Sequence, residues 1–330
     1  MKPSPISPTV DLDRDGVQHG FLKLPYSRDD AAWGAVMIPI TVVRNGKGPT
    51  ALLTGANHGD EYEGAVALRK LSNSLKAEEV SGCVIIVPFL NYPAFRAGTR
   101  TSPIDRGNLN RSFPGKPDGT VTEKIADYIQ RHLLPRADFV LDIHSGGKTL
   151  DFLPFACIRV LDDKAQEARC QAAMEAFGAP YSMHMLELDS VGMFDTAAEE
   201  AGKVFVSTEL GGGGSSTARS VAIAEQGVRD FLIHCEICKG EMSPRKSIKL
   251  DMPDGDCYVA SMHDGLLEMC VDLGDPVNAG DVVGRVHDAT RTGSAPIEYR
   301  AGRSGILAAR HFPGLIHCGD TLAVVAEVVG

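Results

Sequence analysis

A histidine and three carboxylates lie within six residues, directly after an apolar run. The stretch LLTGANHGDEYEG, residues 52–64, contains His58, Asp60, Glu61 and Glu63. His-x-x-Glu spacing suits a turn that leads into a helix, where both side chains can face one point, as a metal site requires. Acidic residues in the first turn of a helix also complement the helix dipole, so a helix start without a metal explains the same residues. The rest of the sequence has to separate these two interpretations.

Two further apolar runs end in residues that can do chemistry. The run at 137–144 ends in His144, and the run at 203–210 carries Glu209 just before four glycines. Two histidines and a carboxylate form the ligand set of many catalytic zinc sites, which leave a position open for water. On its own, His144 would be expected to be a core histidine with a satisfied hydrogen bond. Three such strand ends in one chain make coincidence a weaker explanation.

These strand ends together predict a metal site made of His58, Glu61 and His144, with one zinc ion per chain. Asp142 stands two residues before His144. It can orient a metal ligand through a hydrogen bond, or serve only as a structural acceptor.

A long Gly/Pro/Asn-rich connection at 91–115 forms a second cluster of polar residues. Loops of this length inside compact domains are usually functional. Guanidinium groups bind carboxylates through two parallel hydrogen bonds, and an adjacent asparagine amide can add another. A solvated basic loop that neutralises nearby acids is an equally good explanation. The residues concerned are Arg96, Arg100, Arg106, Arg111, Asn108 and Asn110.

Alternating strands and helices over residues 1–240 are expected to position these groups. Apolar runs predict strands at 35–43, 50–56, 83–90, 137–144, 151–160 and 203–210. Helices are predicted at 61–76, 121–134, 163–177, 194–201 and 217–236. This alternation predicts an α/β fold with a mostly parallel or mixed sheet and helices on both faces. Ligands bind beyond the carboxyl ends of the strands in such folds, so the chemistry-bearing strand ends should share one crevice.

The C-terminal part has a different pattern, in which short apolar runs alternate with Gly and Asp turns. The segment at 265–286 is echoed at 305–325, which suggests a duplicated pair of hairpins. It resembles the biotinyl/lipoyl barrel-sandwich fold, but the last lysine of the chain is Lys249, so there is no residue for attaching a prosthetic group. We therefore predict a catalytic domain at 1–243, with an N-terminal β extension over about 1–49. A small all-β barrel-sandwich-like domain at 244–330 would cap it or take part in assembly.

Composition restricts the partners. The chain has 330 residues, 43% of them hydrophobic, and a net charge of −10. An acidic chain is a poor candidate for nucleic-acid binding, which needs clustered Lys and Arg. No run approaches the ~20 apolar residues of a membrane helix, and the N-terminus lacks the apolar core of a signal peptide. We expect a cytoplasmic protein that binds a small molecule, and the sequence leaves a homo-oligomer open.

Four motifs together resemble the succinylglutamate desuccinylase/aspartoacylase family, a branch of the zinc carboxypeptidase-like fold. They are NHGDEYEG, NYPAFRAGTR followed by NLNRSFPG, DIHSGG and TELGGGG, in the family's order over roughly residues 50–235. The resemblance implies zinc ligands at His58, Glu61 and His144. It also implies a catalytic glutamate at Glu209, an arginine near the scissile carbonyl at Arg100, and a substrate-carboxylate pair at Asn110 and Arg111.

The N-terminal region narrows this resemblance to family members that act on N-α-acetyl-L-2,4-diaminobutyrate in ectoine breakdown. The expected reaction is zinc-dependent hydrolysis of the acetyl amide, giving acetate and diaminobutyrate. A side-chain ammonium calls for an acid in the pocket, and the candidates are Glu187, Asp189 and Asp195. Each of these can equally be a solvated surface acid. The alternatives are another N-acyl amino acid of the succinylglutamate, acetylornithine or acetylaspartate type, a zinc carboxypeptidase, and an inactive small-molecule-binding protein.

Overall fold

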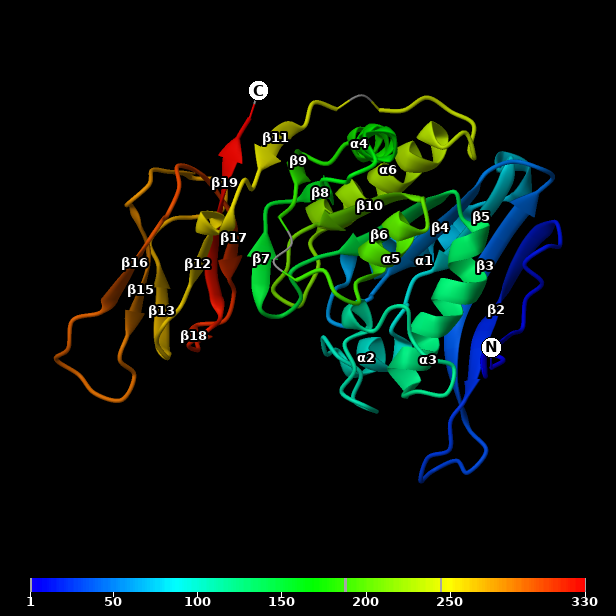
Figure 1. Ribbon diagram of the computed structural model, residues 1–330, viewed down its shortest axis with the longest axis horizontal. Coiled ribbons are helices and arrows are strands. Elements are labelled where there is room, and N and C mark those ends of the chain that lie inside the picture. Colours follow the sequence, from blue (N-terminus) through cyan, green and yellow to red (C-terminus); the bar gives the residue numbers. More distant parts are fainter. Residues whose placement is uncertain (1, 187–188, 244, 330) are drawn as a thin grey trace.

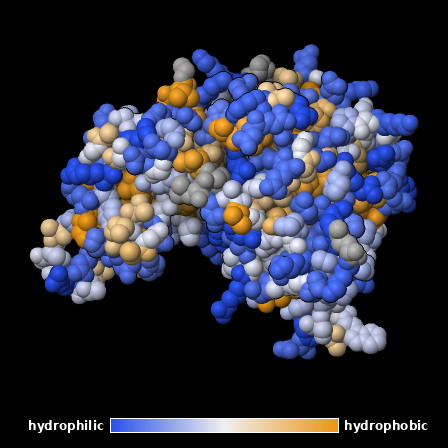
Figure 2. Space-filling model, viewed as in Figure 1, coloured by the Kyte–Doolittle hydropathy of each residue, from blue (hydrophilic) through white to orange (hydrophobic). Residues whose placement is uncertain are grey.

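The computed structural model describes residues 2–186, 189–243 and 245–329, and has one large mixed sheet, flanking helices and a small second sheet (Figure 1). Glu187 lies outside the described residues. Figure 2 shows a mostly hydrophilic face on which apolar side chains are scattered. None of the helices in the described ranges combines the length and the apolar character that a membrane span requires.

The large sheet has a parallel centre with antiparallel strands on either side. Its strands, in order across the sheet, are β1 (Ser7–Pro8), β2 (Gly16–Pro25), β3 (Ala35–Asn45), β5 (Gly82–Val87), β4 (Thr50–Gly55), β6 (Phe139–His144), β10 (Val204–Glu209), β8 (Phe155–Ile158), β9 (Tyr181–His184), β11 (Ile248–Asp251), β19 (Thr321–Val328), β17 (Gly305–His311) and β14 (Pro276–Val277). In addition, β12 (Tyr258–Ala260) pairs with β19, and β7 (Leu150–Phe152) pairs with β17. Strands β5, β4, β6 and β10 run parallel, whereas β3 and β8 pair antiparallel with the two ends of this group. The predicted α/β fold is confirmed.

Helices cover both faces of this sheet. One face carries α1 (Glu63–Ser74), α4 (Lys164–Phe177) and α6 (Ala218–His234), and the other carries α2 (Tyr92–Ala97), α3 (Val121–Tyr128) and α5 (Phe194–Glu200). Alternate residues of a strand point to opposite faces, so Leu52 packs in one core cluster while Ala51 and Leu53 pack in the other. Short helical turns complete the chain: η1 (Ala77–Glu79), η2 (Leu109–Arg111), η3 (Ile129–Leu133), η4 (Leu134–Arg136) and η5 (Gly255–Cys257).

Two predicted elements differ from the structure. The strand predicted at 151–160 is wrong as one strand, because it is divided into β7 and β8 around Leu153–Pro154. Proline lacks the amide hydrogen that a continuous ladder needs, so the chain turns there and the two halves join different partners. The helix predicted at 121–134 is α-helical only to Tyr128 and continues as the π-helical turn η3.

The C-terminal segment confirms the internal repeat. Each copy is a long, a short and a long strand: β13 (Gly265–Met269), β14 and β15 (Val282–His287) in the first, and β17, β18 (Leu315–Ile316) and β19 in the second. The copies interlock, because β14 pairs with β17 and β18 pairs with β13. With β16 (Ile297–Arg300), the strands β13, β15 and β18 form the small antiparallel sheet. Its apolar side chains pack against those of β17 and β19 in one core cluster.

Helix α1 approaches the central strands unusually closely at Gly64. A Cβ atom added to this residue would lie 2.6 Å from the Cβ of Ile143 and 2.9 Å from its backbone oxygen. Ile143 stands between Asp142 and His144 on β6. The missing side chain at Gly64 therefore sets the distance between the helix that follows Glu61 and the strand that carries His144.

We expect Gly64→Ala to lower the free energy of unfolding by about 1–3 kcal/mol, because the added methyl group forces α1 away from β6. Denaturant titration measures this change. Arg69→Ala, at an exposed position of the same helix, should stay within about 0.5 kcal/mol of the wild type. Equal stability of Gly64→Ala and the wild type would show that this contact does not constrain the packing.

Candidate metal centre and active site

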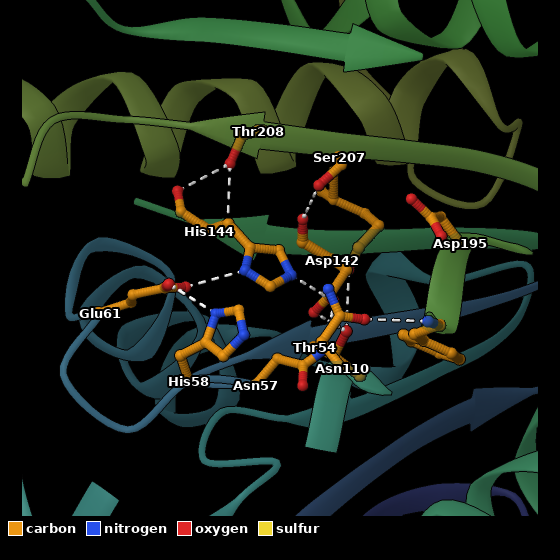
Figure 3. Close-up of polar contacts among 12 residues, drawn as sticks. Thr54, Asn57, His58, Glu61, Asn110, Asp142, His144, Asp195, Ser207 and Thr208 are labelled. Atoms are coloured by element: carbon orange, nitrogen blue, oxygen red, sulfur yellow. Dashed lines mark hydrogen bonds and ion pairs between the residues drawn. The ribbon is translucent and has the colours of Figure 1, made fainter. Parts of the chain in front are cut away.

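Three of the predicted residues converge at the carboxyl ends of neighbouring strands. His58 follows β4, Glu61 precedes α1, and His144 is the last residue of β6. Their candidate ligand atoms all lie within 4.8 Å of one another, and all three residues are buried. The carboxylate of Glu61 reaches both imidazoles: Oε1 is 2.7 Å from Nδ1 of His58, and Oε2 is 2.8 Å from Nδ1 of His144 (Figure 3).

The electrostatics of this cluster suit a cation. Burial raises the pKa of Glu61, but His58 and His144 together lower it below its usual value, so the carboxylate stays anionic. Both imidazoles present Nδ1 to the same place, and a buried donor set of this kind fits a zinc ion. Within the ranges that the structure describes, no other group of three His, Cys, Asp or Glu residues is gathered as tightly.

Asp142 contacts the imidazole of His144 on the side opposite to Glu61. Its Oδ2 lies 2.7 Å from Nε2 of His144, the nitrogen that faces away from Glu61. Thr54 and Asn57 donate to the same carboxylate at 2.6 and 2.9 Å, respectively. Burial lowers the pKa of His144, but Asp142 and Glu61 outweigh burial and raise this pKa well above its usual value. Of the two roles that the sequence left open, the contact with His144 favours the orienting role.

Glu209 ends the neighbouring strand at the same level as His144. In the parallel pairing of β6 and β10 the two residues are direct partners. Thr208, one residue earlier, accepts a hydrogen bond from the backbone N–H of His144 at 3.2 Å. Both Glu209 and the His–Glu–His cluster line one cavity. The expectation that the three chemistry-bearing strand ends share one crevice is confirmed.

The Gly/Pro/Asn-rich connection at 91–115 contributes three of its residues to this cavity: Arg100, Asn110 and Arg111. The guanidinium of Arg100 lies 3.7 Å from Oε1 of Glu61 and its side chain is 47% exposed, so most of its donors face the cavity or solvent. Asn110 is buried on η2, where its Oδ1 accepts from the N–H of Phe194, which leaves its Nδ2 as a donor. Arg111 uses one Nη1 hydrogen bond to hold the backbone oxygen of Asn110.

The remaining loop residues lie elsewhere. Arg96 is exposed and contacts the Tyr92 hydroxyl, while Asn108 accepts from the backbone of Asn110 at the start of η2. Arg106 adopts a positive φ of 56°. None of these three is among the described residues that line the cavity. Arg96 and Arg106 are exposed, which fits the alternative of a solvated basic loop for this part of the connection.

The cavity has a volume of about 200 Å³ and is lined by residues from both parts of the chain. Its mostly apolar wall combines Phe152, Phe155, Met183 and Phe205 with Met252, Tyr258, Ala308 and Val324 from beyond residue 243. Three charged residues also line it: Arg159, Asp195 and Glu199.

The sequence analysis missed Arg159 and Glu199. The spacing of four between Asp195 and Glu199 in a predicted helix was the available signal, since such residues share a helix face. Of the other two acids considered, Asp189 is exposed and accepts from the backbone of Val191, and Glu187 lies outside the described residues.

This fold and site place the chain in the class of hydrolytic deacylases. Residues 47–235 match the succinylglutamate desuccinylase/aspartoacylase catalytic domain, and the chain belongs to that family. N-alpha-acetyl-L-2,4-diaminobutyric acid deacetylase from Halomonas elongata is 63% identical over 100% of this chain and 97% of its own length.

Two solved structures are similar to this chain over its whole length. The product-bound ectoine utilization protein EutE (DoeB) from Ruegeria pomeroyi is 66% identical, with a TM-score of 0.98 over 99% of this chain and 100% of that chain. A succinylglutamate desuccinylase from Silicibacter sp. TM1040 is also 66% identical, with a TM-score of 0.97 over 100% of both chains. The family resemblance identified in the motifs is confirmed.

We expect Asp142→Asn to weaken zinc binding about 10- to 100-fold, because His144 loses the anionic partner that fixes its orientation. Competition with a chromophoric chelator measures the zinc affinity, and circular dichroism checks the fold. Asp138→Asn, at the exposed residue directly before β6, should leave the zinc affinity within about threefold. Equal weakening in both variants would point to a general effect on β6.

Proposed function

We propose that this protein is a zinc-dependent deacylase that hydrolyses N-α-acetyl-L-2,4-diaminobutyrate to acetate and 2,4-diaminobutyrate. The observation that carries the proposal is the buried convergence of His58, Glu61 and His144 in a cavity that Glu209 also lines. The names of the relatives described above support the choice of acetyl group and amino acid.

His58, Glu61 and His144 would hold the metal ion. Zinc bound in such a set supplies a Lewis acid that polarises a carbonyl oxygen and lowers the pKa of water. Asp142 would keep Nδ1 of His144 turned towards the ion by occupying Nε2.

Glu209 would be the proton carrier of the reaction. It would take a proton from the attacking water as the new C–O bond forms at the acetyl carbon. It would then give a proton to the leaving nitrogen as the amide C–N bond breaks, so that acetate and a free amine result. Arg100, which lies beside Glu61 and lines the cavity, would donate to the oxygen on which negative charge develops.

Asn110 and Arg111 would hold the α-carboxylate of the substrate. The Oδ1 of Asn110 is fixed by Phe194, so its Nδ2 is the group available to a carboxylate. Arg111 retains donors beyond the one that holds the Asn110 backbone, and a guanidinium beside an amide suits a planar anion. Fixing this end of the substrate would place the acetyl carbonyl next to the metal cluster.

We also propose that residues 1–243 form the catalytic domain and that the β domain at 244–330 caps its cavity. Support comes from the apolar wall, to which Met252, Tyr258 and Val324 contribute, and from the pairing of β17 with β7. A cavity of about 200 Å³ with the β strands beyond residue 243 forming part of its wall suits a small acyl amino acid better than a peptide, which argues against the carboxypeptidase alternative.

A panel of acyl amino acids tests the proposed reaction. It contains N-α-acetyl-diaminobutyrate, its N-γ isomer, N-acetylornithine, N-acetylaspartate and N-succinylglutamate, each assayed for amine release with chelator and after zinc addition. We expect chelator-sensitive turnover concentrated on the N-α-acetyl-diaminobutyrate. Preferential turnover of another member would keep the chemistry and reject the substrate. No turnover despite bound zinc would favour the inactive binding protein.

We expect Glu209→Gln to lower kcat about 10²- to 10⁴-fold while zinc remains bound, because the amide cannot carry the proton. Steady-state kinetics and metal analysis of the purified variant measure the two quantities. Glu200→Gln, at the exposed end of α5, is the matched control and should keep kcat within about twofold. Retained activity in Glu209→Gln would remove this residue from the mechanism.

A further inference from the structure

A second charged cluster lines the cavity apart from the metal centre. Arg159, which follows β8, lies between two acids of α5, Asp195 and Glu199. Its Nε and Nη2 lie 3.0 and 2.8 Å from Oε2 of Glu199. Its Nη1 donates to the Thr196 hydroxyl at 2.9 Å and lies 3.8 Å from Oδ1 of Asp195. The guanidinium is therefore engaged on all three of its nitrogens.

The charges of this cluster do not cancel. One arginine faces two carboxylates, so the cluster of Arg159, Asp195 and Glu199 has a net charge of −1 when all three are ionised. The two acids are buried, each with 8% of its surface exposed. Asp195 is the acid that Arg159 compensates less well, because its Oδ1 lies 3.8 Å from Nη1 and beyond hydrogen-bonding distance. A buried carboxylate in such a position is costly unless a further cation approaches it. A ligand with a positive group would supply that cation.

Asp195 has an oxygen available for a ligand. Its Oδ1 accepts from the backbone N–H and the hydroxyl of Thr196. Among the described residues, none is within hydrogen-bonding distance of its Oδ2. The residue lines the cavity and is nine-tenths buried, so this oxygen belongs to the wall of the cavity and not to the outer surface.

The position of Asp195 is tied to the residues proposed to hold the α-carboxylate. Phe194, one residue before it, donates its N–H to Oδ1 of Asn110 at 2.9 Å. Figure 3 shows this bond leading from Asn110 to the start of α5, where Asp195 follows. This hydrogen bond links Asn110 and Arg111, which can donate to an anion, to Asp195, which can accept from a cation. An amino acid with a carboxylate at one end and a side-chain ammonium at the other carries the complementary charges.

The other cations of the cavity do not offer an alternative site for an anionic side chain. Among the described lining residues the arginines are Arg100, Arg111 and Arg159. Arg100 lies beside Glu61, and Arg111 holds the backbone of Asn110. Arg159 is occupied by Glu199 and Thr196. A substrate with a second carboxylate would have to meet the net negative cluster, which would repel it.

We propose that Asp195 binds the side-chain ammonium of the substrate through Oδ2, and that Arg159 and Glu199 position it. This inference rests on the proposed function for the identity of the ligand, but it concerns a different contact and makes a separate claim: the cavity selects a cationic side chain over a neutral or an anionic one. A helix-start role alone, in which Asp195 only complements the dipole of α5, would give no such selection.

A pair of ligands that differ only in charge tests the proposal. L-2,4-Diaminobutyrate ends in an ammonium, and L-norvaline carries a methyl group in its place. Calorimetric titration of the zinc-loaded protein with these two amino acids measures binding without turnover. Kinetics with their N-α-acetyl derivatives measures kcat and KM separately.

We expect Asp195→Asn to weaken the binding of diaminobutyrate about 10- to 100-fold, the range for loss of a hydrogen bond to a charged group. Norvaline binding should change less than about threefold. Likewise, kinetics should deteriorate for N-α-acetyl-diaminobutyrate and change little for N-α-acetyl-norvaline. Asp195→Ser, a smaller side chain, should behave alike. Asp189→Asn, an exposed acid of the same connection, is the matched control and should resemble the wild type.

Three results would overturn the inference: equal loss of both ligands in Asp195→Asn, unchanged binding of diaminobutyrate in that variant, or no preference of the wild type for diaminobutyrate over norvaline. The outcomes also separate this inference from the proposed function. Asp195-dependent binding of diaminobutyrate without hydrolysis of its acetyl derivative would reject the reaction alone. Hydrolysis that is indifferent to Asp195 would reject the binding role alone.

Discussion

The carboxylate of Glu61, buried between two imidazoles, is the interaction on which the rest of the site depends. Only 2% of Glu61 is exposed, so solvent stabilises the anion little and it depends on His58 and His144 within hydrogen-bonding distance. His144 in turn needs Asp142, which needs the hydroxyl of Thr54 from the neighbouring strand. The register of β4 against β6 is therefore part of the metal site.

Close backbone packing maintains this register. Gly64 lets α1 lie against Ile143, and a Cβ added to Gly55 would lie 2.9 Å from the carbonyl carbon of Gly64. Glu61 lies in the turn before α1, and His144 lies on β6. A change in the distance between this helix and this strand would therefore also change the distance between the two ligands. Because both contacts are made by glycines, an added side chain at either position would push the helix and the strand apart. The metal ligands that these elements carry would then move as well.

The cavity combines two opposite electrostatic ends within an apolar wall. The metal cluster with Arg100, Asn110 and Arg111 suits the amide and carboxylate of an acyl amino acid, and the cluster around Asp195 suits a cation. Apolar residues from beyond residue 243, among them Met252, line the same cavity, and an apolar wall strengthens the electric field at both ends. Selectivity in such a site comes from mismatched charges as much as from matched ones.

The sequence alone determined most of the elements and the residues that the strand ends bring together. Runs such as 137–144, buried on both faces, predict central strands, and the strand-end rule brings His58, His144 and Glu209 together. Only the tertiary structure decided which distant charges meet: Arg159 lies at the end of a predicted strand that Pro154 divides, and its partners Asp195 and Glu199 follow some forty residues later. Hydrophobic periodicity reports which face of an element is buried, but it carries no information about which buried polar groups pair across the fold.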